Sequence, residues 1–186
     1  MKVILITGES GVGKSTFAKL LSKIDSWNYE IVKSFTTRPQ RDKHDTDHIF
    51  IPLEANLVAQ RLFGSESCVA RTIINGELYF TIKENFHPFN TNLYIIDNEG
   101  IEYLQSHYPN WNTTIVKIVS NEVNIPENRK NRNITIPKDD ECDIIIKREG
   151  IQYRVIYRKQ EVITDESDPL SYSSWAQLDN GRIIMS

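Results

Sequence analysis

The sequence predicts an α/β fold, a three-layer sandwich built on a mostly parallel five-stranded sheet. Five short runs of β-branched and other apolar residues alternate with more polar stretches, as expected for strands that are buried on both faces. The first run leads through a glycine-rich loop into a helical pattern, which is half of a βαβ unit. Further along, an asparagine-glycine pair separates two more runs, which is typical of a small antiparallel hairpin.

Residues 2–24 are predicted to form a strand, a loop and a helix. Residues 2–7, KVILIT, form a nearly continuous apolar run that stops at Gly8. The loop GESGVGKST follows, and residues 17–24 then carry apolar side chains at helical spacing.

The next part of the chain predicts a mixed region. Residues 29–35 form a second strand candidate, and a polar loop at 36–48 follows it. Residues 53–63 have the apolar spacing of a helix. The runs 67–74 and 77–82 flank the asparagine-glycine turn and predict the hairpin.

Three further apolar runs, at 92–97, 113–120 and 142–147, complete the predicted five-stranded sheet. The stretch between the last two is polar and basic at its centre, so we predict a short lid over about 121–138. Residues 151–163 alternate apolar and polar side chains and predict another strand, entered through a turn at Glu149-Gly150.

Composition predicts a single soluble domain in the cytoplasm, present as a monomer or homodimer. The net charge of −3 argues against a broad basic face for nucleic acid. No apolar run approaches the roughly 18 residues that span a bilayer, and the N-terminal run is too short for a signal peptide. The two cysteines and four histidines lack metal-binding spacing, so we expect neither a zinc site nor a disulfide framework.

The loop GESGVGKS satisfies the phosphate-binding (P-loop) pattern G-x-x-x-x-G-K-[ST]. Its glycines let backbone N–H groups converge on phosphate oxygens at the positive end of the next helix. Lys14 would bridge the β- and γ-phosphates, and the Ser15 hydroxyl would ligate Mg²⁺. We therefore predict that the chain binds a nucleoside triphosphate, ATP or GTP, with Mg²⁺ through Glu9, Ser10, Gly11, Val12, Gly13, Lys14, Ser15 and Thr16.

The stretch SFTTRPQR, residues 34–41, gathers anion-binding groups on the loop after the second predicted strand. Arg38 and Arg41 supply charged forks, and a serine and two threonines supply neutral donors. An acceptor that is a phosphate monoester carries about −1.5 to −2 charge at neutral pH, so cations must hold it beside a triphosphate. Because its oxygen is already ionised, it needs no general base. The stretch therefore predicts a second phosphate site.

Over roughly residues 2–150 the chain resembles the guanylate kinase family of nucleoside monophosphate kinases. The segments GESGVGKST, SFTTRPQR, DHIF, GELYFT and DNEG stand in the family's order at comparable spacings. The resemblance implies ATP- and Mg²⁺-dependent phosphorylation of a nucleoside monophosphate by a domain at 1–150, with an acceptor-binding region at about 34–82. Beyond the resemblance, the aromatic and apolar residues near the C-terminus predict that 151–186 form an extension that packs on the same domain.

The resemblance also implies roles for individual residues. The acceptor phosphate would be held by Ser34, Arg38, Arg41, Tyr79 and, where the family has a tyrosine, His48. Asp97 would organise the acceptor and, with Ser15, the metal. Lys14 and Arg38 would act on the transferred phosphoryl group together with two lid arginines, Arg129 and Arg132.

Besides His48, two further features depart from the family pattern. The glutamate that reads guanine in the family falls on Ala70, which leaves open GMP, a different or modified base, a deoxynucleotide or a sugar phosphate as acceptor. In addition, 151–163 predicts a strand where the family has a helix.

Other classes of function compete with the kinase. A non-catalytic guanylate-kinase-like binding module is one, although such modules usually have a degraded phosphate loop. A GTPase is disfavoured because the guanine-reading motif N-K-x-D is absent. A nucleic-acid-binding protein is supported only by basic clusters such as YRVIYRK.

Overall fold

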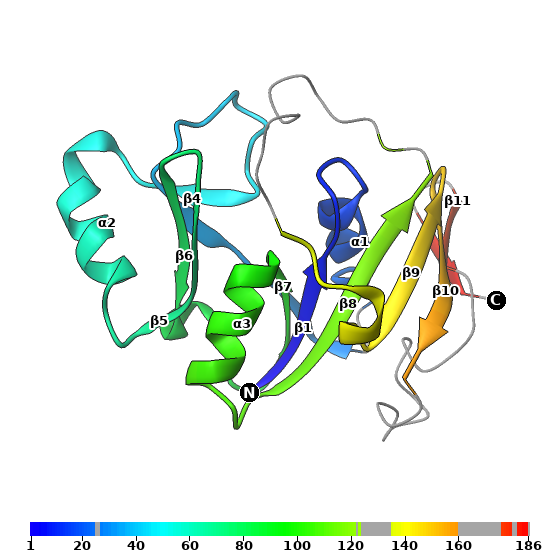
Figure 1. Cartoon of the computed structure of the whole chain (residues 1–186). Coiled ribbons are helices and arrows are strands. Elements are labelled where there is room, and N and C mark those ends of the chain that lie inside the picture. Colours follow the sequence, from blue (N-terminus) through cyan, green and yellow to red (C-terminus); the bar gives the residue numbers. More distant parts are fainter. Residues whose placement is uncertain (25–26, 122, 124–134, 160–175, 180–181, 186) are drawn as a thin grey trace.

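Two β-sheets and three α-helices form the part of the chain that the structure describes (Figure 1). The computed structural model describes residues 1–24, 27–121, 123, 135–159, 176–179 and 182–185. Most of the predicted lid, with Arg129 and Arg132, lies outside the described residues.

The larger sheet has eight strands in the order β12-β11-β10-β9-β8-β1-β7-β2. Its five parallel strands are β1 (Lys2–Thr7), β2 (Tyr29–Val32), β7 (Thr91–Ile95), β8 (Asn112–Ser120) and β9 (Ile144–Glu149). Three antiparallel strands follow β9, namely β10 (Gln152–Arg158), β11 (Ala176–Asp179) and β12 (Arg182–Met185). The fold is α/β with a parallel-dominated sheet. The sheet has eight strands where five were predicted, because the chain after β9 turns back and adds β10, β11 and β12 at the open edge of β9.

The central strand β1 is buried on both faces. Val3 and Leu5 pack on one side of the sheet while Ile4 and Ile6 pack on the other, because successive side chains of a strand alternate. Each of the four is at most 2% exposed.

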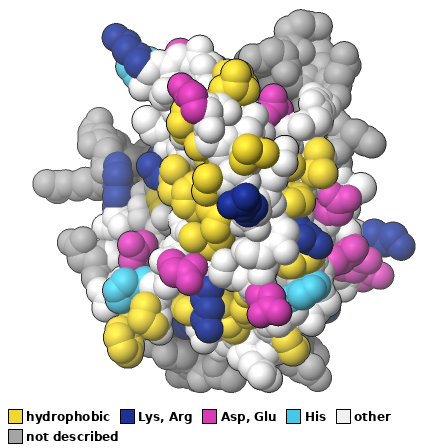
Figure 2. Space-filling model, turned by 90° about the vertical axis from the view of Figure 1, so that its left-hand side faces the viewer, with side chains coloured by type: hydrophobic (Ala, Val, Ile, Leu, Met, Phe, Trp, Pro, Cys, Tyr) yellow, Lys and Arg dark blue, Asp and Glu magenta, His cyan; other side chains and the backbone are white. Residues whose placement is uncertain are grey.

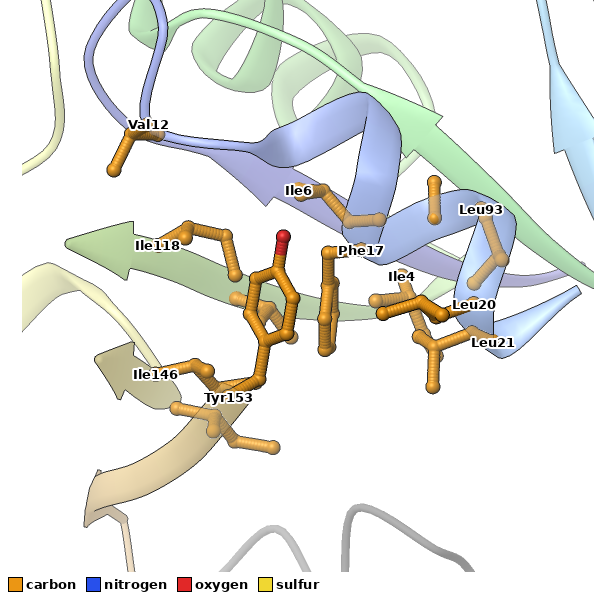
Figure 3. Close-up of a cluster of buried hydrophobic side chains, with 13 residues drawn as sticks. Ile4, Ile6, Val12, Phe17, Leu20, Leu21, Leu93, Ile118, Ile146 and Tyr153 are labelled. Carbon is orange, nitrogen blue, oxygen red and sulfur yellow. The ribbon is translucent and has the colours of Figure 1, made fainter. Parts of the chain in front are cut away.

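One helix covers each of these two faces. α1 (Lys14–Leu21) buries Phe17 and its apolar neighbours on the Ile4 side, as Figure 3 shows. The apolar pattern predicted a start at residue 17, but α1 begins at Lys14, so Lys14 and Ser15 belong to its first turn. On the opposite face, α3 (Asn98–His107) packs between the two sheets.

The helix α3 was not predicted from the sequence. Asp97 caps its N-terminus by accepting a hydrogen bond from the backbone N–H of Gly100 at 2.9 Å. Ile101 and Leu104, three residues apart, are its buried apolar residues. This short stripe, beside a glycine within the first turn, gives little periodic signal.

The smaller sheet has the order β4-β3-β6-β5. The strands β5 (Cys68–Ile74) and β6 (Glu77–Ile82) form the predicted hairpin, and Asn75 and Gly76 take positive φ values of 53° and 81° at its turn. β3 (Ser34–Thr36) pairs with β6, and β4 (His48–Phe50) pairs with β3. The strand predicted at 29–35 is therefore two strands, since the chain passes from the larger to the smaller sheet at Lys33.

The helix predicted at 53–63 is a 3₁₀ turn, Leu53–Ala55, followed by α2 (Asn56–Phe63). Its inner side packs on the smaller sheet through Ala59. Its outer side is apolar and exposed: Leu53 is 82%, Leu57 71% and Val58 56% exposed. Figure 2 views the molecule from this side and shows hydrophobic side chains across the surface. Two further 3₁₀ turns lie at Lys83–Asn85 and Asp139–Glu141.

The strand predicted at 151–163 is present as β10, which turns back from β9 at Gly150 with a φ of 60°. Within the described residues, no helix has both the length and the apolar character needed to cross a membrane.

The packing of α3 can be tested with a pair of leucine substitutions. Leu104→Ala, at a side chain with 0% exposure, should lower the free energy of unfolding by about 2–5 kcal/mol because it leaves a cavity. Leu57→Ala, at a side chain that is 71% exposed, should change it by less than about 0.5 kcal/mol. Urea unfolding followed by circular dichroism measures both, and equal effects would contradict the described packing.

Candidate functional site

One cavity of about 570 Å³ gathers most of the residues that the sequence singled out. It is lined by the glycine loop with the start of α1, the loop between β3 and β4, the paired strands β5 and β6, and the end of β7. The predicted site residues in its lining are Ser10, Gly11, Gly13, Lys14, Ser15, Thr16, Ser34, Arg41, His48, Tyr79 and Asp97. The predicted donor and acceptor groups therefore face the same space.

The glycine loop, residues 8–13, needs glycine at its two ends. Gly8 and Gly13 have φ values of 136° and 104°, which L side chains rarely adopt. A Cβ atom on Gly8 would also collide with the backbone carbonyl oxygen of Ile118 on β8. Val12, which lies outside the cavity lining, buries its side chain in the core beneath the loop (Figure 3).

Lys14 folds back onto the loop. Its Nζ donates hydrogen bonds to the carbonyl oxygens of Gly8 at 2.8 Å and Glu9 at 2.6 Å. Glu9 therefore takes part through its backbone, and its side chain is outside the cavity lining. These bonds hold the ammonium group against the loop that would receive phosphate.

Asp47 connects the loop between β3 and β4, residues 37–47, to α1. We call this segment the acceptor loop. The sequence did not reveal the contact. The Oγ atom of Ser15 donates to Oδ2 of Asp47 at 2.9 Å, and Nζ of Lys19 approaches Oδ1 at 3.2 Å. Burial disfavours the charged carboxylate, but the hydrogen bonds from Ser15 and Lys19 outweigh it and lower the pKa of Asp47. The segment DHIF includes Asp47 but indicates no role for it, because its partners lie 28 and 32 residues away in the sequence.

The hairpin of β9 and β10 supports the glycine loop from the other side. The Tyr153 hydroxyl donates to the carbonyl oxygen of Gly13 at 3.1 Å, and its ring lies 5.2 Å from that of Phe17 (Figure 3). Arg148, which lines the cavity, donates from Nη1 to the carbonyl oxygen of Val12 at 3.4 Å. Neither residue was predicted to belong to the site. The alternating pattern that predicted β10 gives no hint of a contact 140 residues away.

The two arginines of the acceptor loop take different positions. Arg41 lines the cavity, whereas Arg38 lies outside its lining. The guanidinium of Arg38 donates to Oδ2 of Asp45 at 2.8 Å and lies 5.0 Å from the centre of the Phe50 ring. Burial opposes its charge, but Asp45 and the nearby Tyr79 raise the pKa of Arg38. Arg38 thus helps to hold the loop together.

Three other predicted acceptor residues meet in the cavity. The rings of His48 and Tyr79 contact edge to face with centroids 5.4 Å apart. The Oγ atom of Ser34 and the hydroxyl oxygen of Tyr94 are 3.1 Å apart, and both groups are buried. Burial raises the pKa of Tyr94, so this hydroxyl stays protonated. Tyr94 is a further cavity residue that the sequence had not indicated.

Asp97 stands at the end of β7 in the cavity lining, where its Oδ1 caps α3. Burial raises the pKa of Asp97, and the hydrogen bond from the backbone N–H of Gly100 only partly offsets this. The predicted metal ligand therefore also has a structural task.

The wall around Ala70 carries hydroxyl groups. Ala70, Thr72 and Tyr79 line this part of the cavity from β5 and β6. The Thr72 hydroxyl donates to Oε2 of Glu99 at 2.6 Å, and Glu99 itself is outside the lining.

No group of three or more histidine, cysteine, aspartate or glutamate side chains in the described ranges is arranged to hold a metal ion. Mg²⁺ beside a nucleotide does not require such a group, because phosphates and water supply most of its oxygen ligands. The oxygen donors of Ser15, Asp47 and Asp97 fit this chemistry.

Comparison with known proteins finds a distant likeness of fold. Among solved structures, guanylate kinase from Anaplasma phagocytophilum matches with a TM-score of 0.45 and 18% sequence identity. The match covers 65% of this chain and 61% of that one. No family model and no curated protein matches the sequence. A likeness at this level does not assign a function, so the case for one depends on this chain's own residues.

The partly buried pair of Arg38 and Asp45 predicts a pH-dependent contribution to stability. Asp45→Asn should lower the free energy of unfolding at pH 7 by about 1–3 kcal/mol, because Arg38 loses its ionised acceptor. The fold lowers the pKa of Asp45 from its ordinary 3.8, despite an opposing effect of burial, mainly through the hydrogen bond from Arg38. The stabilisation is therefore present above that pH and is lost as pH falls through the lower folded value.

Unfolding curves of the wild type and Asp45→Asn, measured from neutral pH down to about pH 3, should converge at the acid end. Asp42→Asn, an exposed aspartate on the same loop, is the matched control and should follow the wild type throughout. A difference for Asp45→Asn that stayed constant with pH would rule out the ion pair as its cause.

Proposed function

We propose that this protein is an ATP- and Mg²⁺-dependent kinase that transfers the γ-phosphoryl group of ATP to a nucleoside monophosphate. The observation that carries this proposal is the meeting of two phosphate-binding elements in one cavity. A complete glycine loop with Lys14 and Ser15 lies on one side, and the loop with Arg41 lies on the other. Phosphoryl transfer needs the two substrates in line and their charges balanced, and this arrangement could provide both.

On the donor side, the backbone N–H groups of the glycine loop would bind the β- and γ-phosphates. Lys14, already held against the loop, would place its charge on the transferred group. When bound, Mg²⁺ supplies further charge neutralisation for these phosphates. Ser15 and a carboxylate of the cavity would hold the ion.

On the acceptor side, Arg41, His48 and Tyr79 would bind the monophosphate. Arg38 adds support for an anion here. Its Nε and Nη2 atoms are buried and make no hydrogen bond of normal geometry among the described residues, although Tyr79 lies close by. Leaving such donors unsatisfied costs about 1–3 kcal/mol, and a phosphate beside Tyr79 would satisfy them. An ionised phosphate oxygen attacks without a general base.

The base is the feature in which we expect this chain to differ from guanylate kinases. Guanine presents two adjacent N–H donors, which a carboxylate reads well. At that wall this chain has Ala70, with the hydroxyl-bearing side chains of Thr72 and Tyr79 also in the lining. We therefore propose a monophosphate with another or a modified base, such as a deoxynucleotide, as the preferred acceptor. A sugar phosphate without a base is the alternative.

Arg129 and Arg132 remain proposed lid arginines, outside the described residues, that would add positive charge to the transferred group.

Two other functions have specific observations to consider. A binding module would keep the fold and lose catalysis, but the intact loop around Lys14 favours an enzyme. The segment DNEG at 97–100 also satisfies the D-x-x-G pattern of GTP-hydrolysing switches. Here that segment starts α3, with Asp97 as its cap, and no N-K-x-D motif accompanies it in the sequence.

Substitution of the loop lysine tests the donor site. Lys14→Met should lower kcat/KM for phosphoryl transfer by at least about 10²–10³-fold, because the charge on the transferred group is lost. The fold should persist, as judged by circular dichroism and the melting temperature. Lys23→Met, at an exposed lysine just beyond α1, is the control and should retain full activity. Full activity of Lys14→Met would refute the proposal.

An assay of ADP release tests the acceptor, with Mg-ATP and a panel of ribonucleoside and deoxyribonucleoside monophosphates and ribose phosphates. We expect ADP release to depend on an acceptor other than GMP. A preference for GMP over all other acceptors would contradict the hypothesis that Ala70 indicates another base. Tight Mg-ATP binding without transfer to any acceptor would favour the binding module instead.

A further inference from the structure

Asp47 lies where the donor and acceptor sides of the cavity meet. It belongs to the same loop as Arg41, directly before β4, yet its side chain reaches α1. There its Oδ2 accepts the hydrogen bond from Ser15 and its Oδ1 faces Lys19. The carboxylate is thus placed beside the hydroxyl group that the phosphate-loop pattern assigns to Mg²⁺.

The spacing of the two oxygen atoms suits a shared ion. Ligand oxygens lie 2.0–2.1 Å from Mg²⁺ in a nearly regular octahedron, so neighbouring ligands are about 2.9 Å apart. Oγ of Ser15 and Oδ2 of Asp47 are separated by 2.9 Å. The pair could accept an ion between them with little movement of either residue.

The charges around Asp47 are also compatible with a cation. Mg²⁺ prefers hard oxygen ligands, and carboxylates are its commonest protein ligands. Lys19 is the cationic partner of Asp47 in this structure, at 3.2 Å, and its side chain is 58% exposed. Exposed ion pairs of this kind contribute about 0–1 kcal/mol, so Lys19 can give way to a divalent ion at small cost.

Asp97, the metal ligand that the family resemblance implies, is placed differently. Its Oδ1 accepts the N–H of Gly100 and starts α3. This bond fixes the orientation of the Asp97 carboxylate and occupies one of its two oxygen atoms. The hydrogen bonds of Asp47 within the described part of the chain come from two side chains of α1, so a metal ion there would replace side-chain contacts and leave the helix backbone in place.

We propose that Asp47, together with Ser15, holds the Mg²⁺ that accompanies the donor nucleotide. This inference rests on the proposed function of the glycine loop as a nucleotide site. Because Asp47 shares its loop with Arg41, a metal bound by Asp47 would also tie the acceptor loop to the loaded donor site. Donor binding would then order the loop that receives the acceptor phosphate.

Binding of Mn²⁺, used in place of Mg²⁺, tests the metal site without any turnover. Free Mn²⁺ is measured by electron paramagnetic resonance during titration of the protein with a non-hydrolysable ATP analogue present. Asp47→Asn should weaken the Mn²⁺ affinity of the protein–nucleotide complex about 10–100-fold. The control Asp42→Asn, on the same loop, should stay within about twofold of the wild type. Binding of a fluorescent ATP analogue in EDTA should be unchanged in both variants.

Limited digestion with trypsin gives a second readout that also reports on folding. Mn²⁺ with the nucleotide analogue should slow cleavage after Arg41 and Lys43 in the wild type and in Asp42→Asn. The same addition should give no protection in Asp47→Asn, while the digestion pattern without ligands stays like that of the wild type.

Mn²⁺ affinity of Asp47→Asn equal to that of the wild type would overturn the inference. So would a loss confined to Asp97→Asn, which would assign the ion to Asp97. If Asp47→Asn loses the metal but no monophosphate is phosphorylated, the metal site stands and the proposed kinase function fails. If the wild type binds no nucleotide with or without metal, both are refuted.

Discussion

The burial of β1 between β7 and β8 is the constraint on which the rest of this structure depends. A parallel strand with neighbours on both sides must be apolar on both faces, and β1 fills this position with Val3, Ile4, Leu5 and Ile6. Its chain then leaves the sheet beside the carbonyl group of Ile118, where there is room for glycine alone. Parallel strands end at the same edge, so the glycine loop after β1 and Asp97 after β7 open into one cavity.

The side of the cavity opposite the glycine loop is built by a segment that runs from the larger sheet into the smaller one. After Val32 the backbone leaves the larger sheet, and at Ser34 it enters the smaller one. The hydrogen bond between Ser34 and Tyr94 joins the two sheets at this point. The following loop is then fixed from within by Arg38 and Asp45 and from outside by the contact of Asp47 with α1. The two arginines consequently take different positions: Arg38 pairs with Asp45 within the loop, and Arg41 lines the cavity.

The glycine loop is likewise supported from both directions. Asp47 contacts Ser15 from the acceptor side, and the hydroxyl of Tyr153 holds the carbonyl of Gly13 from the edge strands. The antiparallel strands after β9 therefore do more than cover an open edge, because β10 supplies Tyr153 and its approach leaves no space for a side chain at Gly13. The glycine loop is therefore in contact both with the loop between β3 and β4 and with the hairpin of β9 and β10.

Features that depend on local rules could be predicted from the amino-acid sequence alone. These are β1, the glycine loop and the hairpin turn at Asn75 and Gly76, because backbone conformations that favour glycine or asparagine and apolar alternation can be recognised within a few residues. Four other features became apparent only in the folded chain: 29–35 divides between two sheets, α3 forms, Arg38 turns to Asp45, and Asp47 contacts Ser15. The last contact joins residues 32 apart, and that of Tyr153 with Gly13 joins residues 140 apart. Such contacts follow from which strands become neighbours in a sheet, and a one-dimensional pattern does not contain that information.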